Sequence, residues 1–188
     1  RTGGVPGDRR EGQGRTRGVR SAPMRPAYAQ RMARYNRWQN NNLYDVADRL
    51  SDKERRLDRG AFFKSIHATL SHLLWADGQW MARFEKQERP PGSIVDSVSL
   101  FPDWDDLKTK RAAMDQRIIS FADTLPETWL DGEVSWFSGA IQRDMTKPAW
   151  IVLTHMFNHQ THHRGQVHAM LTHAGGKPHD TDFWVMPE

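Results

Sequence analysis

Five of the chain's nine histidines lie within fourteen consecutive positions, residues 155–168, which read HMFNHQTHHRGQVH. An α-helix turns by about 100° per residue, so side chains four positions apart lie on the same face. Two imidazoles at this spacing can bind one metal ion, because their ring nitrogens bridge the gap of about 6 Å between the Cβ atoms. The stretch therefore predicts either a metal site or the polar face of one helix.

Four side chains of this stretch share one helical face, namely His155, His159, His163 and Gln166. The three histidines form two overlapping pairs with a spacing of four residues. Spacing alone does not choose between the two pairs. His162 falls on the edge of the same face.

A pair of histidines needs a third ligand from another helix to hold a metal ion tightly. His168 is not a candidate, because it lies about 180° from His159 and is expected to be exposed to solvent. His67 and His72 differ by about 140° in direction, so at most one of them faces a common point. His72 lies in the most apolar part of its segment, SHLLWAD, and is expected to face inward. Asp77 follows five residues later and is expected to point elsewhere, so no carboxylate is identified as a general base.

The elements that must position these residues are helices, since apolar side chains recur at three- and four-residue spacing in four segments. Carboxylates open the third segment, as suits a helix N-terminus, and Pro126 closes it. In the fourth segment Pro148 is expected in the first turn, and Gly175 with Gly176 ends the helix. The four helices are expected at about residues 26–50, 61–84, 103–125 and 147–174.

The connections between these helices contain helix-breaking residues. Residues 51–60 are expected to form a polar connection, and the consecutive prolines in ERPPGS, residues 88–93, must interrupt the chain. Residues 132–145 alternate weakly around a Ser-Gly pair, which predicts a short hairpin or extended excursion. The fold class is therefore predicted as all-α, a four-helix bundle with this excursion before the last long helix, because each apolar stripe needs another helix to cover it.

Composition narrows the chemistry and the compartment. The chain has no cysteine, so any metal ligands must be nitrogen or oxygen atoms and any thiol must come from another molecule. No run of eighteen apolar residues is present, so we expect no membrane span and a cytoplasmic protein. The eight tryptophans include Trp38, Trp75 and Trp80, which are expected to pack in the core or at a dimer interface. Trp184 is expected to pack the C-terminus onto the bundle.

The net charge of +4 is carried by the first 23 residues, which hold six arginines against Asp8 and Glu11. The remainder is neutral, so the folded part does not predict nucleic-acid binding. Residues 1–23 are rich in Gly and Arg and are predicted to be a disordered tail, with the folded domain at 24–188. We interpret the tail as an expression remnant or a start assigned too early, rather than an RNA-binding arm, since the first methionine is Met24.

Three stretches resemble a known family. NHQTHHRGQ at 158–166, preceded by HMF, together with SHLLWAD at 71–77 and YNRWQN at 35–40, resembles the DinB family of bacterial helical-bundle proteins. The match covers about residues 24–178 in order and spacing. This family is distinct from the error-prone DNA polymerase that shares the name, and nothing in the sequence is typical of a polymerase.

The resemblance implies a four-helix bundle, commonly a homodimer, with a divalent metal ion bound by three histidines. Zinc and nickel both suit imidazole ligands. Carried over by position, the ligands are His72, His159 and His163. The polar groups left beside the site are His155, His162 and Gln166, the last as a donor to a ligand or a pocket residue.

Two functions follow from this resemblance. The first is a metal-dependent enzyme of unknown substrate, either a transferase that uses a small-molecule thiol cosubstrate or a hydrolase that uses metal-activated water. The alternative is a non-catalytic metal- or ligand-binding stress-response protein, in which the ion mainly stabilises the bundle. A fourth protein ligand, such as His155, would favour the alternative, whereas an open coordination position would favour the enzyme.

Overall fold

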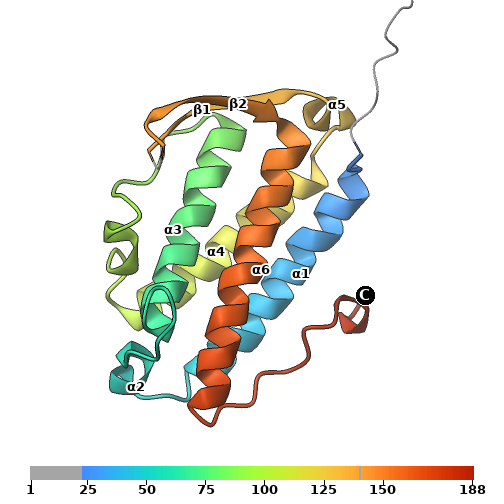
Figure 1. Ribbon diagram of the computed structural model, residues 1–188. Coiled ribbons are helices and arrows are strands. Elements are labelled where there is room, and N and C mark those ends of the chain that lie inside the picture. The colour runs from blue at the N-terminus through green and yellow to red at the C-terminus, as the bar shows by residue number, and fades with distance from the viewer. Residues whose placement is uncertain (1–22, 140) are drawn as a thin grey trace, which may run out of the picture.

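The computed structural model describes residues 23–139 and 141–188, which are mainly helical with one small antiparallel sheet (Figure 1). The predicted tail, residues 1–23, lies outside this part except for its last residue. Four long helices dominate the described part, and each packs against two of the others: α1 and α3 both contact α4 and α6. Their bounds are α1 Pro26–Ala47, α3 Ile66–Glu85, α4 Trp104–Asp123 and α6 Ala149–His173. None of the described helices is both long and apolar enough to cross a membrane.

Two helix starts differ from the prediction. α3 begins at Ile66 and not at Ala61, because Lys64 has a φ of 66°, which a helix cannot accommodate, and Ser65 caps the helix by accepting from the Ala68 amide. The predicted polar connection contains a short helix, α2 (Asp52–Arg56), which begins with a capping box between Ser51 and Glu54. The predicted start of α4 is confirmed, with Asp103 as its N-cap.

The expected hairpin is present. Strands β1 (Glu133–Ser138) and β2 (Arg143–Pro148) pair antiparallel and cross over the ends of α3 and α6 (Figure 1). Pro148 was predicted in the first turn of the last helix, but it is the final residue of β2, where it pairs with Glu133. α6 therefore begins at Ala149, directly after the strand, and the hairpin is joined to it without a loop.

Apolar packing forms two separate layers. One buried cluster lies toward the hairpin and includes Met81, Ile118 and Leu153, and the other lies toward α2 and includes Leu70 and Leu107. On each of the four long helices, buried polar residues lie between the positions that contribute to these two clusters. The residues of this layer, each exposed by 5% or less, are Asn36, Asn40, Asp77, Arg111, Asp115, Gln160 and Arg164.

This buried polar layer is held by ion pairs and hydrogen bonds between different helices. Arg111 donates to Asp77 over 2.6 Å and pairs with Asp115 at 2.8 Å. Asn40 donates to the same Asp115 oxygen over 2.8 Å. Gln160 on α6 donates to the other oxygen of Asp77 over 2.9 Å. Each contact satisfies a group that would be costly to bury alone, so the layer fixes how the four helices sit against one another.

The C-terminal segment runs along α1 (Figure 1). Asn42 exchanges two hydrogen bonds with the backbone of His179, and the Tyr35 hydroxyl donates to the carbonyl of Thr181 over 2.6 Å. Phe183, in the 3-10 helix η2 (Phe183–Val185), packs on the Tyr35 ring at 5.1 Å between centroids. Trp184 was expected to make this contact, but it is 82% exposed, because its neighbour occupies that position.

Replacing Asp77 by Ala is expected to destabilise the protein by about 3–5 kcal/mol, because it leaves the buried Arg111 and Gln160 without their shared acceptor. The matched control is Asp123→Ala, which removes a partly exposed carboxylate from its pair with Arg34 and should cost about 0–1 kcal/mol. Equilibrium denaturation of the two variants beside the wild type measures both values. Equal losses would contradict a central role for the polar layer.

Candidate metal centre

Three histidines meet between α3 and α6. One ring nitrogen from each of His72, His159 and His163 lies within 4.8 Å of the other two. His72 comes from α3, and the other two come from α6, which lies beside it (Figure 1). His72 and His163 are buried, and His159 is half-buried. Three imidazoles from two packed helices are a suitable ligand set for a divalent metal ion.

The protonation of His72 is set by Ser97. Its Nδ1 lies 2.8 Å from the Ser97 hydroxyl, and that hydroxyl donates its own proton to the Ile94 carbonyl over 2.6 Å. The hydroxyl can therefore only accept from His72, so Nδ1 carries the imidazole hydrogen. The bare Nε2 points at Nε2 of His159, 3.4 Å away.

The same logic applies to His163. Its Nδ1 lies 2.8 Å from the Oε1 atom of Gln166, and a carbonyl oxygen only accepts, so Nδ1 again carries the hydrogen. The amide nitrogen of Gln166 lies 3.2 Å from Nε2 of His162 and can donate to it. In this arrangement Gln166 accepts from His163 and connects it to His162. The Nε2 lone pair of His163 is left free to act as a ligand.

All three rings are neutral at neutral pH. Burial, with a smaller contribution from neighbouring histidines, lowers the pKa of His72 to about 4 and that of His159 to about 3. Burial also lowers the pKa of His163. Neutral imidazoles are the form that binds metal. Nε2 of His72 and Nε2 of His159 face each other at 3.4 Å, where either a hydrogen on one ring or a bound cation can lie between them, so the neutral cluster fits a metal ion.

Aromatic rings cover the sides of the cluster. The Phe63 ring lies 4.0 Å from the His72 ring and 5.3 Å from the His163 ring, and Trp75 lies 5.9 Å from His72, measured between centroids. Phe63 belongs to the turn before α3, where the left-handed Lys64 directs the chain back toward the helix. These rings reduce contact with water on that side of the site.

The segment that carries Ser97 is held tightly on α3. Pro90 packs against Gly78, where an added Cβ would come within 2.8 Å of the proline ring. The Ser71 hydroxyl donates to the Ser97 carbonyl over 2.5 Å. The 3-10 helix η1 (Asp96–Val98) therefore presents the Ser97 side chain to His72 from a fixed backbone.

The remaining histidines lie elsewhere. His155 is exposed, and its ring packs on Trp80 at 5.2 Å and lies 6.0 Å from the ring of His159. His67 is buried, and its Nε2 donates to the Phe101 carbonyl over 2.8 Å, away from the cluster. His168 is outside the cluster as expected, but it is half-buried rather than exposed.

The sequence analysis missed the roles of Ser97 and Phe63. Ser97 lies in a loop without periodicity, so no spacing argument connects it to His72. Phe63 lies within residues 61–84, which were expected to form one helix, and only the break at Lys64 turns it toward the histidines. A positive φ at a lysine is not detectable from residue type, whereas glycine at that position would have indicated it.

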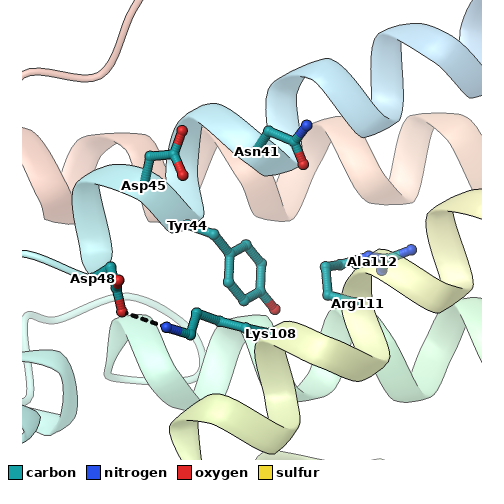
Figure 2. Close-up of a pocket in the computed structure, with 7 residues that line it drawn as sticks. All are labelled: Asn41, Tyr44, Asp45, Asp48, Lys108, Arg111 and Ala112. Carbon is teal, nitrogen blue, oxygen red and sulfur yellow. Dashed lines mark hydrogen bonds and ion pairs between the residues drawn. The ribbon is translucent and has the colours of Figure 1, made fainter.

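A small cavity of about 160 Å³ lies between α1 and α4. Figure 2 shows the seven residues that line it, with Lys108 extended to Asp48, which it contacts at 2.8 Å. Its lining contains no histidine, and the charges of Lys108 and Asp48 neutralise each other. The lining residues are Asn41, Tyr44, Asp45, Asp48, Lys108, Arg111 and Ala112. The histidine cluster is therefore the stronger candidate for a functional site.

Fold and site together define a mainly helical protein with a three-histidine cluster that could hold a metal ion. The chain matches the DinB family over residues 24–188 and belongs to that family. It is 24% identical over 168 residues to Protein DinB of Bacillus subtilis (strain 168), covering 83% of this chain and 91% of that protein. The crystal structure of a DinB-like protein from Bacillus cereus ATCC 10987 has a similar fold, with a TM-score of 0.51, 16% identity and coverage of 77% of this chain and 91% of that one.

Replacing Ser97 by Ala is expected to weaken the affinity for a divalent ion by about 10- to 100-fold, because His72 loses the contact that fixes its tautomer and direction. The control is Ser99→Ala, since Ser99 is an exposed serine of the same segment that bonds only to the Asp96 carbonyl. Competition with a chromophoric chelator measures the affinity. Unchanged affinity in Ser97→Ala would show that the hydroxyl does not orient the ligand.

Proposed function

We propose that this DinB-family protein is a metal-dependent enzyme that holds a zinc or nickel ion through His72, His159 and His163. The observation that carries the proposal is the direction of the ring nitrogens. Ser97 and Gln166 hold the hydrogens of His72 and His163 on Nδ1, so that the Nε2 lone pairs are presented inward. A buried polar face with no ligand to bind would not need two tautomers fixed in this way.

The site supports catalysis better than a purely structural ion. Among the described residues, three side chains that can bind a metal ion converge on this point, and all three are histidines. Three protein ligands would leave a coordination position open. His155, the expected fourth ligand in a closed site, packs instead on Trp80. A closed site would favour the non-catalytic stress-response alternative, so this arrangement favours the enzyme.

Each protein group has a defined task in the proposed reaction. His72, His159 and His163 would hold the divalent ion, and the ion would supply the means of lowering the pKa of a bound thiol or water at neutral pH. Phe63 and Trp75 limit water on one side of the histidines. Because the chain has no cysteine, a thiol nucleophile must belong to a small-molecule cosubstrate. We therefore favour a thiol-dependent transferase, with hydrolysis by bound water as the nearest variant.

Assembly is a separate proposal. The four long helices that pack pairwise support the four-helix bundle implied by the family, and the family also implies a homodimer. Light scattering of purified protein tests the dimer. A monomer across micromolar concentrations would contradict it and would leave the metal site, which is built from one chain, unaffected.

Elemental analysis tests the ligand set. The wild type is expected to bind about one zinc or nickel ion per chain, and His163→Ala is expected to lose most of it, because two imidazoles alone hold a metal ion weakly. His168→Ala is the matched control, since His168 lies on the same helix outside the cluster and should leave the metal content unchanged. Full metal content in His163→Ala would exclude the proposed ligands.

A panel of small thiols with electrophilic substrates tests the reaction. The metal-loaded wild type is expected to accelerate thiol addition, and removal of the ion with a chelator or the change His159→Ala should reduce the rate by at least about 100-fold. Restoring the metal should restore the rate in the wild type alone. If metal binds fully but neither thiol transfer nor ester hydrolysis is detected, the non-catalytic alternative gains support.

A further inference from the structure

Arg83, near the end of α3, is a half-buried cation for which the described residues provide no hydrogen-bond acceptor. Its Nε atom is buried without a partner. The guanidinium instead lies over the Trp80 ring, with its central carbon 4.6 Å from the ring centroid. Glu85, two residues further along the helix, does not neutralise it, because that carboxylate is bound by Arg117 at 2.5 Å and 2.9 Å. A partly buried charge without a partner is costly and is typical of a residue that awaits an anion.

Electrostatics agree with this interpretation. Burial, together with the positive charge of Arg89, lowers the pKa of Arg83 to about 10. Arg83 therefore remains charged at neutral pH, and the described residues provide no counter-ion for it. The other arginines of α3 and α4 differ: Arg111 meets Asp77, and Arg117 meets Glu85.

Arg83 lies on the same side of α3 as the histidine cluster. It follows His72 by eleven residues, which places it about 20° from His72 in direction and about 16 Å further along the axis. A series of ring contacts joins the two ends, since Trp80 packs on His155 at 5.2 Å and His155 lies 6.0 Å from His159. A small molecule with one end at the histidines could thus extend along α3 toward Arg83.

The hairpin lies next to this end of α3. The Trp136 ring of β1 packs edge to face on the Trp80 ring at 5.5 Å, where the hairpin crosses the end of α3 (Figure 1). Trp80 and Trp136 are both half-buried. This end of the interface between α3 and α6 therefore combines two indole rings with one unpaired guanidinium, which suits an apolar chain ending in an oxyanion.

We propose that Arg83 binds the oxyanion group, carboxylate or phosphate, of the small molecule whose reactive end lies at His72, His159 and His163, with Trp80 and Trp136 contacting its apolar middle part. This inference rests on the proposed function and narrows its substrate class to amphiphilic anions. The planar guanidinium presents paired N–H donors that match an oxyanion, and the stack on Trp80 holds it in place. Arg83 is in this sense a specificity-determining residue and not a catalytic one.

The first arm of the test uses a molecular ruler. Cobalt-substituted protein is titrated with ω-mercaptoalkanoates of increasing chain length, and binding is followed by the thiolate-to-cobalt absorption band. The ω-mercaptoalkanols of the same lengths are the neutral controls. At one range of lengths the carboxylates are expected to bind about 10- to 100-fold more tightly than the alcohols, and Arg83→Gln should abolish this advantage without affecting the alcohols. Arg89→Gln, which removes an exposed charge nearby, should leave the advantage intact.

The second arm separates this inference from the proposed function. Metal-free protein is titrated by calorimetry with simple alkanoates and with alkyl phosphates, which lack a thiol and distinguish the two oxyanions. Binding that is lost in Arg83→Gln but not in Arg89→Gln supports the anion site even if no thiol binds to cobalt, in which case only the thiol chemistry fails. If the alcohols bind to cobalt as well as the carboxylates at every length, or if Arg83→Gln binds both anion series like the wild type, the proposal for Arg83 is overturned.

Discussion

The buried ion pair between Asp77 and Arg111 is the contact on which the rest of the structure depends. Both side chains are almost fully removed from water, and both bind groups on other helices: Asp77 contacts α4 and α6, and Arg111 contacts Asp77 on α3 as well as Asp115 on its own helix. Two arginines and two aspartates in this layer balance in charge. If the partner of a buried charge is displaced, the desolvation cost of that charge is no longer compensated. The apolar clusters on either side could pack with the helices in several relative positions, whereas the contacts of the polar layer allow only one.

This relative position of the helices determines where the histidines lie. Gln160 directly follows His159 on α6, and Asp77 follows His72 by five residues on α3, so the hydrogen bond between Gln160 and Asp77 lies beside the meeting point of the two imidazoles. Adjacent residues on a helix point about 100° apart. When Gln160 is directed into the centre of the helices, His159 is directed toward the edge between α3 and α6. The polar layer therefore positions the histidines through the backbones of α3 and α6, and Asp77 contributes to this without contacting the histidines.

The sequence predicted the parts of this arrangement that depend on periodicity. The face shared by His155, His159 and His163 follows from helical geometry, and so does the exclusion of His168 from that face. Spacing could not choose between the two overlapping pairs, since both satisfy the same geometry. The choice depends on which part of α6 lies next to His72. This is determined by the packing of α3 against α6 and not by the sequence of either segment alone.

Other features depend on interactions that leave no periodic signal. The left-handed Lys64 directs Phe63 to the histidines, and Ser97 reaches His72 from a loop whose course is set by Pro90 packing on Gly78. The C-terminal segment was predicted correctly to lie against the helices, but the residue that makes the contact is Phe183 and not Trp184, a difference of one position in a segment without regular structure.

The two faces of α6 differ in chemistry. Toward the centre its polar groups contact the charged and amide groups of the polar layer, so they specify structure. Toward α3 one ring nitrogen from each of the three histidines converges on one point, and further along that edge Arg83 carries a charge for which the described residues provide no acceptor. Unsatisfied groups reduce stability, and a small protein can tolerate them only where the remaining contacts are strong. The polar layer supplies that rigidity, so the histidines and Arg83 keep the orientation that the proposed metal and anion sites need.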